Sequence, residues 1–265
     1  MANAKTDSGL VLEQRGAVLV ISITTPGEKN RLLPEALVTL EDLGRKLFSN
    51  SEINAVVVRG HGEADFSSGL LNPVVRAAMS KDEVVAMVRL ANRAFNALEA
   101  VPQIVIASLN GEVKAGGSEL ALACDIRLAA AHATMQFPEA SWGGFPGAGG
   151  PARLATIVGR GRALELICTG RAIGAAEMEK IGLVEGVFDG GALAAETEAL
   201  AMRIASAGPL ATRGAKRIIK ARFEPGASHA HDVSDALRSA LEWSADVDEA
   251  SAAHRENRAP VFKGR

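Results

Sequence analysis

Two glutamates and a glycine pair between residues 110 and 150 are the part of the sequence best suited to chemistry. Gly116 and Gly117 precede a short apolar segment that carries Glu119, and Glu139 follows twenty residues later. A glycine pair that opens a helix exposes backbone N–H groups, which can hold an oxygen on which negative charge develops. Two carboxyl groups beside one bound molecule can move protons on and off carbon and water. The combination predicts chemistry next to a polarised carbonyl.

The sequence around the two glutamates argues against their being ordinary surface carboxylates. A lone glutamate is more often a solvated surface carboxylate, and most glycine pairs are only tight turns. Here Glu119 is followed by the apolar run 120–123, and Glu139 lies between Phe137-Pro138 and Trp142. We therefore expect both carboxyl groups to be buried or half buried. Burial raises a carboxyl pKa and a helix N-terminus lowers it, so the sequence leaves the net direction open.

Three other motifs fail on their context. Ser118 in GGSEL resembles a nucleophile elbow, but Leu120 occupies the position of the closing glycine. The GAGGPA run at 147–152 fits a dinucleotide fingerprint without the strand that must precede it. The chain contains no tyrosine, which excludes the Tyr/Lys chemistry of short-chain dehydrogenases and with it NAD-dependent reduction. The run 229–232 (His-Ala-His-Asp) is a weak metal signal; we expect a solvated helix start there and no metal site.

Composition is that of an ordinary globular protein. The 265 residues are 23% charged and 48% hydrophobic, and the formal net charge of −2 argues against nucleic acid or an anionic membrane as partner. We find no apolar run of membrane-spanning length and no signal-like segment, so we expect a cytoplasmic location.

Cys124 and Cys168 lie in apolar stretches of the sequence and are expected to be buried, reduced thiols. A local basic cluster could still bind a phosphorylated ligand: Lys216, Arg217, Lys220 and Arg222.

Hydrophobic periodicity predicts an α/β core followed by helices. Residues 10–23 read as a strand pair joined at Arg15-Gly16, and 54–60, 103–109 and 125–130 read as further strands. Helices are expected at 34–48, 81–100 and 117–124, then at 192–206 and 210–222, with two more after Pro225. This succession favours mixed sheets in a core of residues 1–206. Residues 207–265 form a helical lobe too small to stand alone, which should pack on the core or on a neighbouring subunit.

Several collinear runs give the chain a resemblance over nearly its full length. They are AVLVISITTPGEKN, VVVRGHGEADFSSG, NGEVKAGGSELALACDIRLA, FPEASWGGFPGAGGPARL, GRALELICTGRAIGAAEMEKIGLVEGVF, the 208–216 segment and DVDEASAAHRENRAPVF. In this order they resemble the enoyl-CoA hydratase/isomerase (crotonase) superfamily. The resemblance implies a ββα superhelix, or spiral, with a C-terminal helical lobe, assembled as homotrimers that often pair into hexamers. It also implies an acyl-CoA substrate, with coenzyme A as part of the substrate and no other cofactor.

By position, the resemblance assigns the site. The thioester oxygen would be held by the N–H groups of Leu70 and Gly116, and the two hydratase carboxyl groups would be Glu119 and Glu139. The CoA and acyl parts would contact Lys29, Arg31, Ser68, Leu70, Leu71, Asn72, Pro73 and Gly116, with Lys216 reaching the phosphates.

Two departures from the family pattern bear on the pocket. Ser68-Gly69-Leu70-Leu71 replaces the usual Ala-Gly-Ala-Asp, which should alter the acyl pocket and a helix-capping contact, and Lys114-Ala115 replaces Leu-Gly. Hydration of a 2-enoyl-CoA is the activity we expect. A double-bond isomerase with Glu139 as sole base, or a CoA-binding protein without turnover, are the alternatives.

Overall fold

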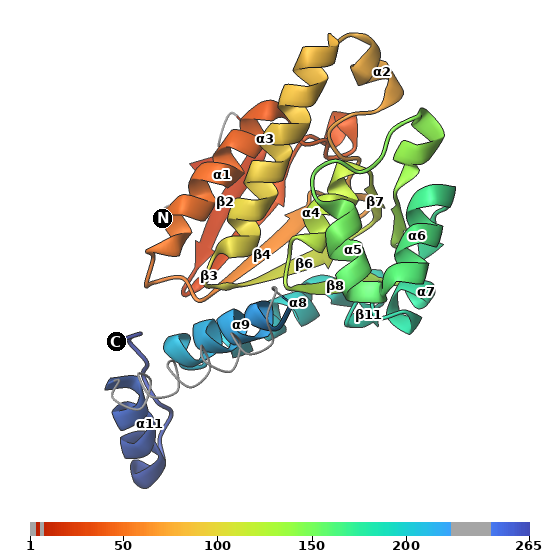
Figure 1. Cartoon of the computed structure of the whole chain (residues 1–265). Coiled ribbons are helices and arrows are strands. Elements are labelled where there is room, and N and C mark those ends of the chain that lie inside the picture. The colour runs from red at the N-terminus through yellow and green to blue at the C-terminus, as the bar shows by residue number, and fades with distance from the viewer. Residues whose placement is uncertain (1–3, 6–7, 224–244) are drawn as a thin grey trace.

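Two β-sheets and a set of flanking helices make up the protein. The computed structural model describes residues 4–5, 8–223 and 245–265 (Figure 1). The strands are β1 (Ala4–Lys5), β2 (Leu10–Arg15), β3 (Val18–Ile23), β4 (Ala55–Gly60), β5 (Asp65–Ser67), β6 (Ile104–Leu109), β7 (Glu112–Lys114), β8 (Ile126–Ala130), β9 (Thr134–Gln136), β10 (Ile173–Gly174) and β11 (Gly186–Phe188). The helices are η1 (Pro26–Glu28), α1 (Pro34–Phe48), α2 (Pro73–Ala77), α3 (Lys81–Ala100), α4 (Gly116–Leu122), η2 (Pro138–Trp142), α5 (Gly150–Val158), α6 (Arg160–Thr169), α7 (Ala175–Lys180), α8 (Gly190–Ala205), α9 (Pro209–Phe223) and α11 (Ala245–Glu256).

The sheets are mixed, as predicted. The larger has the order β1-β2-β3-β4-β6-β8-β11, in which β1, β2 and β3 pair antiparallel and the remaining neighbours pair parallel. The smaller has the order β10-β9-β7-β5, parallel except for the β10–β9 pair. The chain alternates between them: β4, β6 and β8 of the large sheet are followed by β5, β7 and β9 of the small one, and then by helices. This is the expected repeat of two strands and a helix.

Amphipathic patterning explains the helices that cover one face of the large sheet. In α1 the buried side chains include Leu37, Leu40 and Leu43, spaced by three residues, and Pro34 starts the helix at a position that needs no N–H donor. Helix α3 begins at a capping box in which the Ser80 hydroxyl accepts from the Glu83 N–H and the Glu83 carboxylate accepts from the Ser80 N–H. The two helices pack together above the sheet, while α8 lies on the opposite face against β4, β6 and β8 (Figure 1).

The predicted elements of the core are confirmed, with α1 and α3 beginning and ending at the expected residues. In the tail, α9 and α11 match two expected helices, and the prediction of another helix after Pro225 concerns residues 224–244, which lie outside the described part. The prediction of two buried thiols was wrong for Cys168, which is exposed because it lies on the outer side of α6; Cys124 is buried. Among the described helices, none is long and apolar enough to cross a membrane. The division at residue 206 stays a prediction.

Candidate functional site

One cavity brings the predicted catalytic residues together. It has a volume of about 450 Å³ and lies beside α4, α2 and the loop that precedes α5. Both glutamates line it, and so do Leu70 and Gly116. The remaining lining residues are Leu71, Asn72, Pro73, Arg76, Ala77, Val84, Val88, Ala115, Trp142, Gly144, Phe145 and Gly147. The walls are therefore mainly apolar, with a few polar groups in fixed places, as in a site for a small molecule.

Adjacent parallel strands place the two predicted N–H donors side by side. Leu70 follows the carboxyl end of β5 and Gly116 follows that of β7, its parallel neighbour in the small sheet. A Cβ built on Gly116 would lie 3.3 Å from the Leu70 nitrogen and 2.7 Å from the Leu70 Cγ. Glycine at position 116 therefore lets the two loops approach this closely without moving the Leu70 side chain. Within the described part of the chain, neither the Leu70 N–H nor the Gly116 N–H donates a hydrogen bond, so both are free for a ligand oxygen.

The backbone around these donors is held in strained but well-supported conformations. Gly69, before Leu70, has a φ of 87°, and its N–H donates to the Ser67 hydroxyl at 3.1 Å. Ala115, before Gly116, has a φ of 51° and a ψ of −125°, which is unfavourable for a residue with a Cβ. The Ala115 N–H donates to the Gln136 carbonyl at 3.0 Å, which ties the turn to β9. Strain of this kind is found where the chain must aim a backbone group.

Glu119 is buried within α4 and fixed by two amides. Its side chain is part of a residue only 3% exposed, and its Oε1 accepts hydrogen bonds from the N–H groups of Ala148 at 2.8 Å and Gly150 at 2.9 Å. Burial raises the pKa of Glu119 to about 7, against the lowering effect of the two amides, and the neighbouring carboxyl group of Glu139 raises it further. Desolvation is thus the larger of the two opposing effects that the sequence left open.

Glu139 lies in η2, on another wall of the same cavity. It is half buried, and burial raises the pKa of Glu139 to about 7 as well. Its Oε2 is shielded from solvent and has no hydrogen-bond partner within the described part of the chain. The short helix is fixed by a hydrogen bond from the Gly144 N–H to the Glu139 carbonyl at 2.9 Å, and it ends at Gly143 with a φ of 74°. A carboxyl oxygen buried without a partner beside a cavity is available to a bound molecule.

The loop that fixes Glu119 was not predicted. The GAGGPA run does not follow a strand directly, because η2 and a loop come before it, and its Ala148 and Gly150 amides hold the Glu119 carboxylate. A Cβ on Gly150 would lie 2.9 Å from Glu119 Oε1, so the close approach requires glycine. Arg153 supports the turn by donating to the Ala148 carbonyl at 2.8 Å and pairing with Glu99 at 2.8 Å. The clustered glycines before a helix were the available signal.

The expected CoA-binding residues fall into two groups. Leu71, Asn72 and Pro73 line the cavity, and the Asn72 side chain caps α2 by accepting from the Val75 N–H at 2.9 Å. Leucine at position 71 cannot make the helix-capping contact that the family pattern implies there. In this chain Asn72 caps the helix instead. The second group, Lys29, Arg31 and Ser68, does not line the cavity, contrary to the expectation. The Ser68 N–H donates to the Lys29 carbonyl at 2.9 Å, and the Arg31 guanidinium pairs with Glu28.

The structure does not bring Lys216 to the cavity. The residue is 6% exposed, and its ammonium donates to the Asp125 carboxylate at 2.7 Å and to the Gln103 carbonyl at 2.8 Å. Burial lowers the pKa of Lys216, although the Asp125 carboxylate opposes this shift. The expectation that it reaches a phosphate is therefore corrected: its charge is used inside the fold, where α9 meets the start of β6. The sequence showed a lysine on an amphipathic helix but not which face turned inward.

The surroundings of Ser118 support its exclusion as a nucleophile. Ser118 is fully buried and its hydroxyl donates to the Gln136 carbonyl at 2.8 Å, so it is no nucleophile. The described residues contain no group of three or more His, Cys, Asp or Glu side chains that could hold a metal ion. The histidine pair at 229–231 lies outside the described residues.

Comparison with known proteins agrees with this architecture. The model of the enoyl-CoA hydratase/isomerase family matches residues 13–265. The Bacillus subtilis protein YngF is 36% identical over 258 residues, 97% of this chain and 99% of its own length, and the short-chain-enoyl-CoA hydratase of Clostridium acetobutylicum is 34% identical over 80% of this chain and 81% of its own. A crystal structure of an enoyl-CoA hydratase from Bacillus anthracis has a TM-score of 0.93 at 32% identity, covering 97% of this chain and 100% of that one. The chain has the crotonase fold and belongs to the enoyl-CoA hydratase/isomerase superfamily.

Proposed function

We propose that the protein is an enoyl-CoA hydratase, which adds water across the 2,3 double bond of an α,β-unsaturated acyl-CoA thioester. One observation carries the proposal: two carboxyl groups with raised pKa values line the same cavity as two backbone N–H groups that have no partner in the described chain. Hydration needs one group that takes a proton from water, one that gives a proton to carbon, and donors for the enolate oxygen.

The protons can be followed through the proposed step. Glu119, as the carboxylate, takes a proton from the water whose oxygen bonds to the β-carbon. The electron pair of the double bond moves toward the thioester, and its oxygen carries the negative charge between the N–H groups of Leu70 and Gly116. Glu139, as the neutral acid, gives its proton to the α-carbon and the enolate collapses. The protein is left with Glu119 protonated and Glu139 ionised, and one proton exchange with solvent resets it.

The geometry supports this division of roles between the carboxyl groups. Glu119 Oε1 accepts two amide hydrogen bonds, which favour the ionised form that a base requires. Glu139 Oε2 has no such donor among the described residues, which favours the neutral acid. Because the two groups interact, their raised pKa values leave one proton to be shared near neutral pH. General acid–base assistance of this kind is worth about 10² to 10⁴ in rate.

The substrate and the assembly are part of the proposal. Relatives named short-chain-enoyl-CoA hydratase and crotonyl-CoA hydratase are 34% and 33% identical, which supports a 2-enoyl-CoA as substrate. We further propose that no cofactor besides the CoA of the substrate is used, that the protein acts in the cytoplasm, and that it assembles as a homotrimer or a hexamer of two trimers.

An isomerase that shifts the double bond is the second candidate, because it needs only one carboxyl group that moves a proton between carbons. The unpartnered Oε2 of Glu139 favours that residue as the base. In such an enzyme Glu119 would have no proton to move.

Matched isosteric variants separate the two activities. Purified protein is given crotonyl-CoA, and hydration is followed as loss of absorbance from the conjugated thioester; a 3-enoyl-CoA is the substrate for isomerisation. A hydratase should lose about 10² to 10⁴ in kcat in both Glu119→Gln and Glu139→Gln. An isomerase should keep its rate in Glu119→Gln and lose it in Glu139→Gln. Wild-type protein that binds acyl-CoA but converts neither substrate would refute both proposals and leave a CoA-binding protein without turnover.

A further inference from the structure

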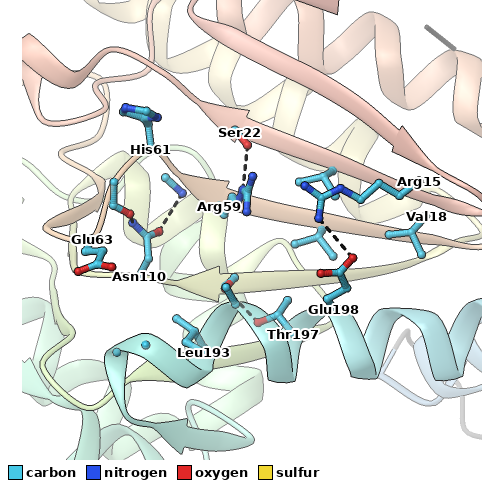
Figure 2. A pocket seen from close by; sticks show the side chains of 18 of the residues that line it. Arg15, Val18, Ser22, Arg59, His61, Glu63, Asn110, Leu193, Thr197 and Glu198 are labelled. Atoms are coloured by element: carbon cyan, nitrogen blue, oxygen red, sulfur yellow. Dashed lines mark hydrogen bonds and ion pairs between the residues drawn. The ribbon is translucent and has the colours of Figure 1, made fainter. Parts of the chain in front are cut away.

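A second cavity lies on the far side of the large sheet from α1 and α3, between the sheet and α8 (Figure 2). Its volume is about 340 Å³, and it shares no lining residue with the cavity of the two glutamates. One end is spanned by an ion pair between Arg15 on β2 and Glu198 on α8, at 3.3 Å. Asn110 and the first residues of α8 lie at the other end (Figure 2). The proposed hydration uses none of these residues.

Strand register places Arg59 in the middle of this sheet face. Arg59 pairs with Ser22 on β3 and with Ser108 on β6, and cross-strand partners project from the same face of a sheet. The next row of the same face is apolar, since Val20 pairs with Val57. The Arg59 guanidinium therefore lies on an inner strand of the sheet, between two serines and beside valines, and the residue is half buried.

The Arg59 guanidinium is only partly used by the protein. Its Nε donates to the Ser22 hydroxyl at 3.0 Å, and no residue in the described part of the chain accepts a hydrogen bond from its two terminal amino groups or forms an ion pair with it. The hydroxyl of the second serine, Ser108, is hydrogen-bonded to the Thr197 hydroxyl at 3.0 Å. Two parallel amino groups of one guanidinium match the two oxygens of a carboxylate.

The acidic groups near Arg59 pair with another arginine or lie at the rim of the cavity. Glu13 on β2 is held by Arg15 through two contacts of 2.9 Å, and Glu198 pairs with the same arginine. The pKa of Glu13 is lowered first by its hydrogen bonds to Arg15 and to a smaller extent by the charge of Arg59. Glu63 is exposed at the opposite end (Figure 2). With carboxylates on both sides, the cavity does not favour a multiply charged anion such as phosphate. A single negative charge placed directly on the guanidinium is what it can accommodate.

The rest of the lining indicates an apolar tail. Val18, Val20 and Val57 form the floor beside Arg59, and Leu193 and Met202 face them from α8. The start of α8 also lines the cavity, and the Asp189 side chain does not cap that helix.

We propose that this cavity is a second binding site, for a small monocarboxylate with an apolar tail. The carboxylate lies on the two terminal amino groups of Arg59, and the tail lies along the valines of β3 and β4. A short-chain fatty acid has this chemistry.

The test uses the full-length wild-type protein with sodium hexanoate as probe and hexan-1-ol, which has the tail without the charge, as its matched control. Isothermal titration calorimetry should show saturable binding of hexanoate and binding of the alcohol weaker by about tenfold or more, because the charged hydrogen bonds are absent. Arg59→Met, which keeps the length of the side chain but removes its donors, should weaken hexanoate binding to a similar extent. Arg93→Met removes an exposed arginine on α3 and should leave binding unchanged.

Each outcome is decisive. Equal affinity of wild-type and folded Arg59→Met for hexanoate, equal affinity for acid and alcohol, or no saturable hexanoate binding would each overturn the proposal, the last leaving a hydrated arginine only. If Arg59→Met fails to fold by circular dichroism, Arg59→Lys takes its place, and it should bind several-fold more weakly because the planar fork is lost. The binding measurements need no turnover, so their result is independent of whether the protein proves to be a hydratase. Crotonyl-CoA kinetics of Arg59→Met should equal those of the wild type.

Discussion

Replacing Gly116 by alanine tests the oxyanion site directly. The added Cβ would lie 2.7 Å from Leu70 Cγ and 3.0 Å from its Cδ1. Non-bonded carbons favour separations of about 3.5 to 4.0 Å, so the two loops must separate by roughly 1 Å. A misplacement of that size can cost about 10²-fold in rate, and complete loss of one oxyanion donor costs about 10² to 10³ in kcat. We expect Gly116→Ala to lower kcat for crotonyl-CoA about a hundredfold, with a smaller change in KM.

A second variant shows whether the collision with Leu70 is the cause. Leu70→Ala keeps the backbone N–H and removes the atoms that the new Cβ meets. In the double variant the closest remaining atom of residue 70 is its nitrogen, at 3.3 Å, a tight contact that a shift of a few tenths of an ångström relieves. We expect the double variant to be about tenfold faster than Gly116→Ala, and a double-mutant cycle measures this coupling.

The assay is the initial rate of absorbance loss at saturating crotonyl-CoA, with thermal unfolding of each variant as the control for folding. A folded Gly116→Ala protein with the kcat of the wild type would refute the role of this N–H. A folded double variant as slow as Gly116→Ala would show that the Leu70 side chain is not the obstacle.

Four further predictions concern the carboxyl groups, the turn at Ala115 and the buried lysine. Because the pKa values of Glu119 and Glu139 are both raised to about 7, kcat/KM for hydration should fall below this pH as the base becomes protonated and above it as the acid ionises; a profile flat from pH 5 to 9 would contradict the assignment. The pKa of Glu139 is raised from 4.5 in the unfolded chain to about 7 in the folded protein, so the wild type loses stability as the pH rises through this range. Glu139→Gln removes this loss. The difference in unfolding free energy between Glu139→Gln and the wild type, measured by urea titration, should therefore favour the variant more at pH 8 than at pH 5. Ala115→Gly should stabilise the protein by about 1 kcal/mol, because glycine adopts the positive φ of residue 115 without strain. The control Ala86→Gly, at an exposed position of α3, should destabilise the protein by about 1 kcal/mol. Equal losses of unfolding free energy in the two variants would show that Ala115 is not strained. Lys216→Met should destabilise by about 3 kcal/mol, because it leaves a carboxylate partner uncompensated, and should leave the KM for crotonyl-CoA unchanged; a raised KM at unchanged stability would restore the phosphate-binding role.

The helices were predictable because their signals are local. Pro34 and the leucines of α1 define a start and a face, and the 81–100 pattern likewise carries its own period. The strands of the small sheet were not predicted as such, since β5, β7 and β9 are three residues each and owe their form to one another. Too short to show alternation, they depend on pairing between distant parts of the chain.

The candidate site divides in the same way. Glu119 and Glu139 were identified from residue type and apolar surroundings, but not that the amides of Ala148 and Gly150 would hold one of them, because that contact joins segments 29 and 31 residues apart. The inward turn of Lys216 was missed for a related reason: an amphipathic pattern shows a face, and only the packed helix shows what that face meets. Cys168 was predicted to be buried because its neighbours in the sequence are apolar, but α6 turns its side chain outward.

The unusual sequence of the loop 68–71 changes the walls of the cavity more than the two N–H donors proposed to hold the thioester oxygen. The position of an N–H group is fixed by the main chain, here by the parallel pairing of β5 with β7 and by the turn at Gly69, and none of these depends on the side chain of residue 70. The leucines at 70 and 71 instead add apolar bulk to the lining of the cavity. The Leu70 side chain occupies the place that a side chain at residue 116 would take, so the large residue at 70 depends on glycine at 116. A change of substrate preference with unchanged chemistry is therefore the physical consequence to expect from this departure.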